Sequence, residues 1–273
     1  MKRIHFSLAI VLVLTLVIAG CGGNTKDNNA GGEEQNKLKV GIMSGPEEDI
    51  WEVVKEVAAK DGLELELVLF SDYIQPNKVL DDGQLDANAF QHGPYLDEFN
   101  ANNGTHVVKL ADTINYPIGI YSEKIKDLAE LKDGDVLGLP NDPTNGGRAL
   151  ILFESAGLIK LKEGVGVTAT VRDIVENPKN LTFKELDAAF IPKTLGELTA
   201  AVINTNFAVP AGLSLTEDAI YSEPKDSPWV NIIAVREADK DKPVFDKLVK
   251  AFHSDEVRKL VEEKYGESMV PAW

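Results

Sequence analysis

A strand–helix–strand pattern begins at residue 37 and strongly limits the folds that this chain can adopt. Residues 37–43 are mostly apolar and end at a Ser-Gly-Pro turn, and residues 47–60 then carry apolar side chains at helical spacing. Residues 63–69 alternate leucine with mostly acidic side chains, which is a strand pattern. A helix between two strands leaves the strands parallel, because the chain returns to the end of the sheet from which it started. The pattern therefore predicts an α/β fold with a parallel sheet.

The same alternation of strands and helices continues to the C-terminus. A short apolar strand is predicted over residues 135–140, with a helix over residues 148–156 after it. Another strand is predicted over residues 230–235. Apolar side chains at helical spacing then predict two closing helices, around residues 244–252 and 257–261. The α/β pattern therefore extends over the whole body of the chain.

The body after the N-terminal segment is long enough for two lobes, since a single domain usually has about 100–150 residues. Proline-marked turns near Tyr116 and Ser227 offer two points where the chain can cross between lobes. We expect one lobe from residues 37–115 plus 229–273 and a second lobe from residues 116–228. Two-lobe α/β proteins bind ligands in the cleft between the lobes, near the carboxyl ends of strands.

The N-terminal segment indicates export and a lipid anchor. Two basic residues precede a short apolar run, which is typical of a secretory signal peptide over residues 1–20. Residues 4–19 are too few for the alternative, a membrane-spanning helix of about 17–25 residues. Cys21, the only cysteine, ends an Ile-Ala-Gly-Cys sequence that resembles a bacterial lipobox, whose cysteine is acylated; the alternative is a buried structural cysteine. Residues 21–36 hold no large apolar side chain and are expected to form a flexible lipidated tether.

Composition and motifs argue against several function classes. The chain has 28 Lys and Arg residues against 44 Asp and Glu, a formal net charge of −16, whereas nucleic-acid binders need a basic face. The sequence contains no nucleophile elbow, Walker loop, zinc-protease motif or Cys-x-x-Cys pair, and its four histidines are scattered. Residues 164–169 only loosely resemble a dinucleotide loop and are expected to be a surface loop. We therefore expect a protein that is not an enzyme and has no cofactor, metal site or nucleic-acid partner.

Four rings lie in polar segments that follow predicted strands. They are Tyr73, Phe90, His92 and Tyr95. Such rings can wall an apolar slot, and contacts between sulfur and aromatic rings suit a thioether ligand. The alternative is a set of ordinary core aromatics with a histidine that caps a helix.

A second polar segment, residues 138–148, runs from a strand through a glycine-containing turn into a helix. The free N–H groups and dipole of a helix start favour an anion, and Arg148 adds a guanidinium fork that matches a carboxylate. The alternative is an Asn-capped helix with a surface arginine. Asn204 and Asn231 each lie beside an apolar strand, where an amide can grip a zwitterion or satisfy local backbone groups. Together with the rings, these residues form a set suited to an amino acid.

Several long motifs follow one another in a single order. They are Asp-Tyr-x-x-Pro-Asn at 72–77, Asp-Ala-Asn-Ala-Phe-Gln-His-x-Pro-Tyr-Leu-Asp at 86–97, Tyr-Pro-Ile-Gly-x-Tyr-Ser at 116–122, Pro-Asn-Asp-Pro-Thr-Asn-Gly-Gly-Arg-Ala-Leu at 140–150, Glu-Asn-Pro-Lys at 176–179, Ile-Asn-Thr-Asn at 203–206 and Ser-Pro-x-x-Asn at 227–231. With the lipobox, this set resembles the methionine-binding lipoproteins, which are the substrate-binding components of methionine ABC importers. The resemblance covers nearly all of residues 38–273.

The resemblance implies a two-lobe type II periplasmic-binding-protein fold that closes on its ligand by a hinge motion. It also implies the contacts of the ligand. The ligand's side chain would lie in a pocket lined by Tyr73, Phe90, His92 and Tyr95. Its carboxylate would bind Arg148, and its amino and carboxylate groups would contact the amides of Asn204 and Asn231. Asn115 and Asn145 are expected as neighbours of this site. Phe207 and Trp229 stand where the family often has tyrosine. We expect Phe207 not to touch the pocket residues and Trp229 to alter the rim of the cleft.

The resemblance also implies a lipid-anchored receptor on the extracytoplasmic face of the cell membrane. Such a receptor captures L-methionine, or D-methionine, and delivers it to an ABC permease and its ATPase. Two alternatives stay open: the same fold binding a methionine-containing dipeptide or methionine sulfoxide, and a surface interaction or adhesin lipoprotein. Under the leading hypothesis, Arg148→Ala abolishes methionine binding with little loss of fold.

Overall fold

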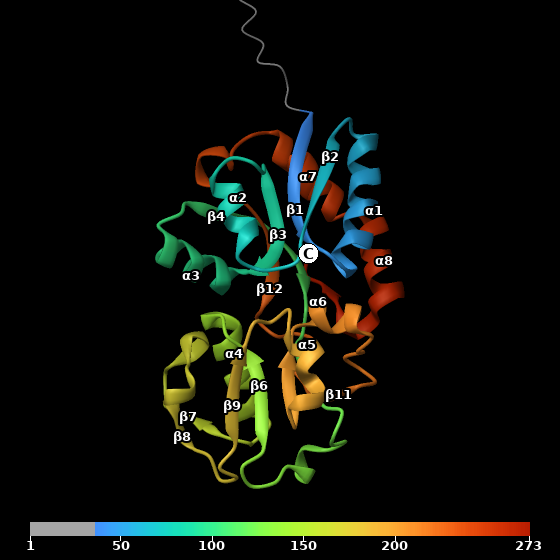
Figure 1. Cartoon of the computed structure of the whole chain (residues 1–273). Coiled ribbons are helices and arrows are strands. Elements are labelled where there is room, and N and C mark those ends of the chain that lie inside the picture. Colours follow the sequence, from blue (N-terminus) through green and yellow to red (C-terminus); the bar gives the residue numbers. More distant parts are fainter. Residues whose placement is uncertain (1–35) are drawn as a thin grey trace, which may run out of the picture. The chain divides into compact units, whose positions relative to one another are not determined.

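The computed structural model describes residues 36–273, in which two main sheets carry the fold (Figure 1). The first sheet has the order β13-β4-β12-β3-β1-β2. Its strands are β1 (Lys37–Met43), β2 (Glu64–Phe70), β3 (Ala87–His92), β4 (Val107–Asn115), β12 (Val230–Arg236) and β13 (Val270–Pro271). β1 is parallel to β2 and β3, whereas β12 is antiparallel to β3 and β4. The predicted strand–helix–strand unit is confirmed, and β1 has the predicted bounds.

The second sheet has the order β11-β5-β10-β6-β9. Its strands are β5 (Gly119–Tyr121), β6 (Val136–Pro140), β9 (Thr182–Leu186), β10 (Ala200–Ile203) and β11 (Ala219–Ser222), and a separate pair joins β7 (Lys160–Leu161) to β8 (Ile174–Glu176). The backbone passes between the two main sheets twice, from β4 to β5 and from β11 to β12. The predicted lobe boundaries at residues 115–116 and 228–229 lie near the ends of these two connections and stay a prediction.

Helices cover both faces of the first sheet (Figure 1). One face carries α1 (Pro46–Lys60), α7 (Val244–Phe252) and α8 (Asp255–Tyr265), and the other carries α2 (Gln75–Asp81) and α3 (Gly93–Asn103). The first face buries a core that includes Trp51 and Phe252, whose ring centroids lie 5.2 Å apart. A smaller core with Leu80 and Leu96 lies on the second face. Both predicted closing helices are confirmed, because α7 and α8 each bury the apolar stripe seen in the sequence.

The helix after β6 begins earlier than its apolar pattern predicts. α4 (Pro143–Ser155) starts at Pro143 instead of Arg148, because Asp142 caps it and proline suits the first helical position. Within α4, a Cβ on Gly147 would lie 1.9 Å from the carbonyl oxygen of Val167. Glycine therefore allows a 3₁₀ turn, η2 (Gly166–Thr168), to pack directly on the helix. The expected surface loop at residues 164–169 is in part a turn docked on α4.

Two further α-helices, which lie next to β10 in the sequence, are short. They are α5 (Ile191–Thr194) and α6 (Thr205–Ala208). Within residues 36–273, no helix combines the length and the apolar character that crossing a membrane requires.

Candidate ligand-binding site

A cleft lies where segments from both main sheets meet at strand ends. β1, β2 and β3 are parallel, so their carboxyl ends share one edge of the sheet, and antiparallel β12 brings its amino end to that edge. The residues that line the cleft are Tyr73, Phe90, Gln91, His92, Tyr95, Tyr116, Asn145, Arg148, Asn204, Thr205, Asn206 and Asn231. The empty space between these residues, including the part that is open to solvent, is about 350 Å³.

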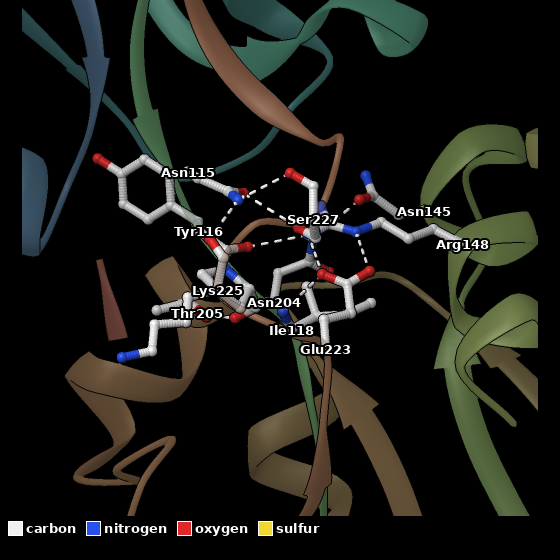
Figure 2. Close-up of polar contacts among 11 residues, drawn as sticks. Asn115, Tyr116, Ile118, Asn145, Arg148, Asn204, Thr205, Glu223, Lys225 and Ser227 are labelled. Atoms are coloured by element: carbon white, nitrogen blue, oxygen red, sulfur yellow. Dashed lines mark hydrogen bonds and ion pairs between the residues drawn. The ribbon is translucent and has the colours of Figure 1, made fainter. Parts of the chain in front are cut away.

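The cleft gathers every predicted contact residue of the described chain except Asn115, although their contact with a ligand stays a prediction. The Nδ2 of Asn115 instead donates hydrogen bonds to the carbonyl oxygens of Lys225 and Ser227, at 2.9 and 2.8 Å. Asn115 thus ties the connection after β4 to the one before β12 (Figure 2). Cys21 lies outside the described residues.

Three predicted rings form one wall of the cleft. The ring centroids of Tyr73, Phe90 and Tyr95 lie 5.8–6.0 Å from one another, and the Tyr95 hydroxyl donates to the Tyr73 carbonyl oxygen at 2.8 Å. Such mutually packed rings form a rigid apolar surface. The ring of Phe207 lies 5.0 Å from that of Tyr73. The expectation that Phe207 does not touch the pocket residues was therefore wrong, because α6 packs this ring against Tyr73.

His92 combines two roles that the sequence left as alternatives. Its Nδ1 caps α3 by accepting a hydrogen bond from the backbone N–H of Tyr95 at 3.1 Å. Burial and the nearby charge of Arg148 lower the pKa of His92 to about 3, so the ring is neutral at physiological pH. A neutral ring that accepts at Nδ1 carries its proton at Nε2. This buried Nε2 makes no close hydrogen bond within residues 36–273, although the Asn145 side chain is near enough to raise the pKa of the ring, and His92 lines the cleft.

Arg148 is buried and already holds a carboxylate of the protein. Its Nε and Nη2 donate to the two carboxylate oxygens of Glu223 at 2.8 and 2.5 Å, and Nη2 also donates to the carbonyl oxygen of Tyr116 at 2.9 Å (Figure 2). The Nε–Nη2 edge of the guanidinium is therefore occupied, and Nη1 is the part left for a ligand. Sequence reasoning missed Glu223, because no pattern distinguishes it from the many solvated acids of this chain.

Trp229 contacts both His92 and Arg148 but is not among the residues that line the cleft, so its expected effect on the rim stays a prediction. Its ring lies 5.7 Å from the ring of His92 and 5.4 Å from the guanidinium carbon of Arg148. A guanidinium over an indole face is attracted by the electrons of the ring. Trp229 therefore helps to hold both side chains in place.

The start of α4 is not an open anion site. The Asp142 carboxylate accepts a hydrogen bond from the backbone N–H of Asn145 at 2.9 Å, so a protein carboxylate already supplies the negative charge that the helix start favours. The alternative for this segment, an Asn-capped helix with a surface arginine, was wrong, whereas the expected carboxylate site beside Arg148 stays a prediction. The capping residue is Asp142, and Arg148 is 2% exposed.

Three buried polar atoms of the cleft have no hydrogen-bond partner among the described residues. They are Nε2 of His92, Nδ2 of Asn206 and Oδ1 of Asn204. Asn206 presents Nδ2 because its Oδ1 accepts from the Tyr73 hydroxyl at 2.6 Å. A buried polar group without a hydrogen-bond partner lowers stability. The two donors and one acceptor here therefore favour a polar ligand that can pair with them. Asn206 lies in the quoted Ile-Asn-Thr-Asn motif, which was the available signal for it.

Glu47, in the first turn of α1, is a second unusual buried group. It is 3% exposed, and neither carboxyl oxygen has a hydrogen-bond partner within residues 36–273. Burial raises its pKa to about 8. The folded protein therefore holds this proton in a pH range where the unfolded chain has lost it. Stability is lost as the pH rises from about 4.5 to about 8.

We expect Glu47→Gln to remove this loss. The variant's advantage in unfolding free energy over the wild type should grow with pH between 5 and 8, by up to about 1.4 kcal/mol per unit. Urea unfolding of both proteins at several pH values measures it. Glu52→Gln, at an exposed position of the same helix, is the matched control and should leave the wild-type pH slope unchanged. Parallel slopes for wild type and Glu47→Gln would contradict the assignment.

A two-lobe α/β body with a small cleft of rings and amides is the architecture of a type II periplasmic binding protein. Residues 38–273 match the NlpA lipoprotein family, and the chain belongs to that family. The resemblance found in the sequence motifs is thereby confirmed at the level of the family.

Similar proteins support the same placement. The D-methionine-binding lipoprotein MetQ of Salmonella typhimurium is 46% identical over 98% of this chain and 97% of its own. Outer membrane lipoprotein 3 of Mannheimia haemolytica is 46% identical over 88% of this chain and 92% of its own. A nutrient-binding protein from Burkholderia cenocepacia, solved bound to methionine, is 49% identical with a TM-score of 0.85, over 86% of this chain and 100% of that one.

Proposed function

We propose that this protein is the substrate-binding component of an ABC importer and captures methionine. The observation that carries the proposal is the set of unpaired donors and one unpaired acceptor beside a wall of three rings. A free amino acid offers a carboxylate to the donors and an ammonium to the acceptor, while a thioether side chain suits the aromatic wall. The names of the relatives support the same ligand.

Each end of the ligand has matching groups in the cleft. Nη1 of Arg148 and Nε2 of His92 are donors for the carboxylate, and Oδ1 of Asn204 is an acceptor for the ammonium. Asn231 faces His92 across the β12–β3 pair and adds a further amide beside the carboxylate donors. The ligand's side chain then lies against Tyr73, Phe90 and Tyr95.

Binding without catalysis is the second part of the proposal. The cleft lining includes no serine or cysteine, and the Thr205 hydroxyl donates to the carbonyl oxygen of Pro117. His92 is neutral and uses Nδ1 to cap a helix, so it has no free basic nitrogen with which to activate a nucleophile. These features support a receptor that releases its ligand unchanged to a permease and its ATPase.

Calorimetry on ligand-stripped protein tests the proposed ligand. L- and D-methionine, methionine sulfoxide and a methionine-containing dipeptide are titrated separately, and mass spectrometry identifies any small molecule released from freshly purified protein on denaturation. We expect free methionine to bind most tightly. A preference for the sulfoxide or the dipeptide would move the assignment to that ligand, and no binding at millimolar methionine would leave the adhesin alternative.

We also propose that acylated Cys21 anchors the protein to the extracytoplasmic face of the cell membrane. The lipobox-like sequence and membership of a lipoprotein family support this anchor. Cys21→Ser is expected to appear in the soluble extracytoplasmic fraction with unchanged methionine affinity, because the anchor is remote in sequence from the cleft residues. Membrane retention of this variant after signal cleavage would count against the anchor.

A further inference from the structure

Two side-chain amides connect the Asp142 carboxylate, at the start of α4, to the cleft by hydrogen bonds. Nδ2 of Asn145 donates to both oxygens of Asp142, at 3.0 and 3.1 Å, and Nδ2 of Asn204 donates to Oδ1 of Asn145 at 2.9 Å. Asn145 is 3% exposed and Asn204 is 7% exposed, so water does not replace these contacts freely. Figure 2 shows Asn145 and Asn204 near the buried Arg148 pair.

The Asp142 carboxylate sets the direction of both side-chain hydrogen bonds in the series Asp142–Asn145–Asn204. An ionised carboxylate can only accept, so Asn145 must turn its Nδ2 toward Asp142 and its Oδ1 toward Asn204. That oxygen in turn requires a donor, so Asn204 gives it Nδ2 and keeps Oδ1 for the cleft. Flipping either amide would place two acceptors or two donors face to face.

We propose that Asp142 is a positioning residue that sets the polarity of both amides, so that an acceptor oxygen faces the primary ammonium of the ligand. This inference rests on the proposed function, because it assigns the ammonium end of the amino acid to Asn204. The buried Oδ1 of Asn204 has no partner among the described residues, and an ammonium is the strong donor that satisfies it. Asp142 itself does not line the cleft and acts only through Asn145.

Capping of α4 is the other role of Asp142, and substitutions can separate it from polarity. Asparagine caps helices about as well as aspartate, and serine also caps well. A new amide or hydroxyl at position 142 can, however, present either a donor or an acceptor to Asn145. Asp142→Asn and Asp142→Ser should therefore keep the fold while releasing the direction of the two amides. We expect each to weaken methionine binding at least about tenfold, measured by calorimetry.

Reversing the direction of the two side-chain hydrogen bonds provides the decisive measurement. Asn204→Asp alone sets a carboxylate against Oδ1 of Asn145, which Asp142 holds in place, and should also weaken binding about tenfold or more. Combined with Asp142→Asn, the same substitution lets both hydrogen bonds run in the opposite direction and still presents an acceptor to the ammonium. The double variant should bind methionine within about threefold of wild type, a recovery that loss of a structural cap cannot produce.

The control is Asp127→Asn, another aspartate that caps a helical turn, η1 (Leu128–Glu130), by accepting from the backbone N–H of Ala129 at 2.8 Å. It does not line the cleft, and its methionine affinity should equal that of wild type. Wild-type affinity in Asp142→Asn, or a double variant no tighter than the weaker single one, would overturn the role of Asp142 while leaving the proposed function standing. Failure of the wild type itself to bind methionine would remove both.

Discussion

Arg148→Ala is expected to lower the affinity for methionine by at least about 100-fold. The variant loses a hydrogen bond between charged groups, worth about 1.5–3 kcal/mol, and leaves the ligand's carboxylate in a buried site without its counter-charge. Since about 1.4 kcal/mol corresponds to a factor of ten, a loss of about 3 kcal/mol or more follows. Calorimetric titration with L-methionine measures it.

The design has to account for Glu223. Truncation of Arg148 strands a carboxylate whose side chain is 7% exposed, so we expect Arg148→Ala to cost more stability than the sequence alone indicates. We therefore make the substitution in a Glu223→Gln background, which removes that stranded charge. The control is Arg236→Ala, whose arginine pairs with Asp239 and contacts the carbonyl oxygen of Leu80, away from the cleft. Wild-type affinity in folded Arg148→Ala/Glu223→Gln would refute the assigned role of Arg148.

Glu223→Gln by itself is expected to lower the free energy of unfolding by about 3–5 kcal/mol, the usual result of breaking a buried ion pair from one side. Arginine does not deprotonate in proteins, so Arg148 would stay charged in a site where it is 2% exposed. Urea unfolding without ligand gives the value. The loss should exceed that from the ordinary exchange of a carboxylate for an amide on the surface.

Two further variants make this measurement selective. Replacing both partners, as Arg148→Met/Glu223→Gln, should be more stable than Glu223→Gln, because no uncompensated charge remains. Glu267→Gln removes the partner of Lys225 in an exposed pair and should change stability little. Equal unfolding free energies for wild type and Glu223→Gln would contradict the expected cost of an uncompensated charge on Arg148.

The pair also links the cleft to both connections between the sheets. Tyr116 follows β4, and Glu223 follows β11, so Arg148 contacts each chain crossing at once. Glu223 additionally accepts a hydrogen bond from the backbone N–H of Ile118 at 3.1 Å. A ligand carboxylate on Nη1 would thus join a network that already includes both connections between the sheets, where we expect the hinge motion to occur.

Most elements of the fold were predictable because their signals are local. The alternation of β2, the apolar stripes of α1, α7 and α8, and the bounds of β1 all follow from side-chain periodicity over a few residues. The start of α4 was missed because its first turns are polar and contain glycines, and their helical state depends on the Asp142 cap and on packing against η2.

The α/β class, the family and the residue types of the cleft can be read from the sequence, since strand and helix periods and long motifs are properties of neighbouring residues. The role of each polar group, in contrast, depends on the folded structure. Arg148 and Glu223 lie far apart in the chain, and so do Asn145 and Asn204, yet each pair is in hydrogen-bond contact. Which donor remains free for a ligand depends on such long-range partners, because a buried group's hydrogen-bonding capacity is set by whatever the fold places beside it.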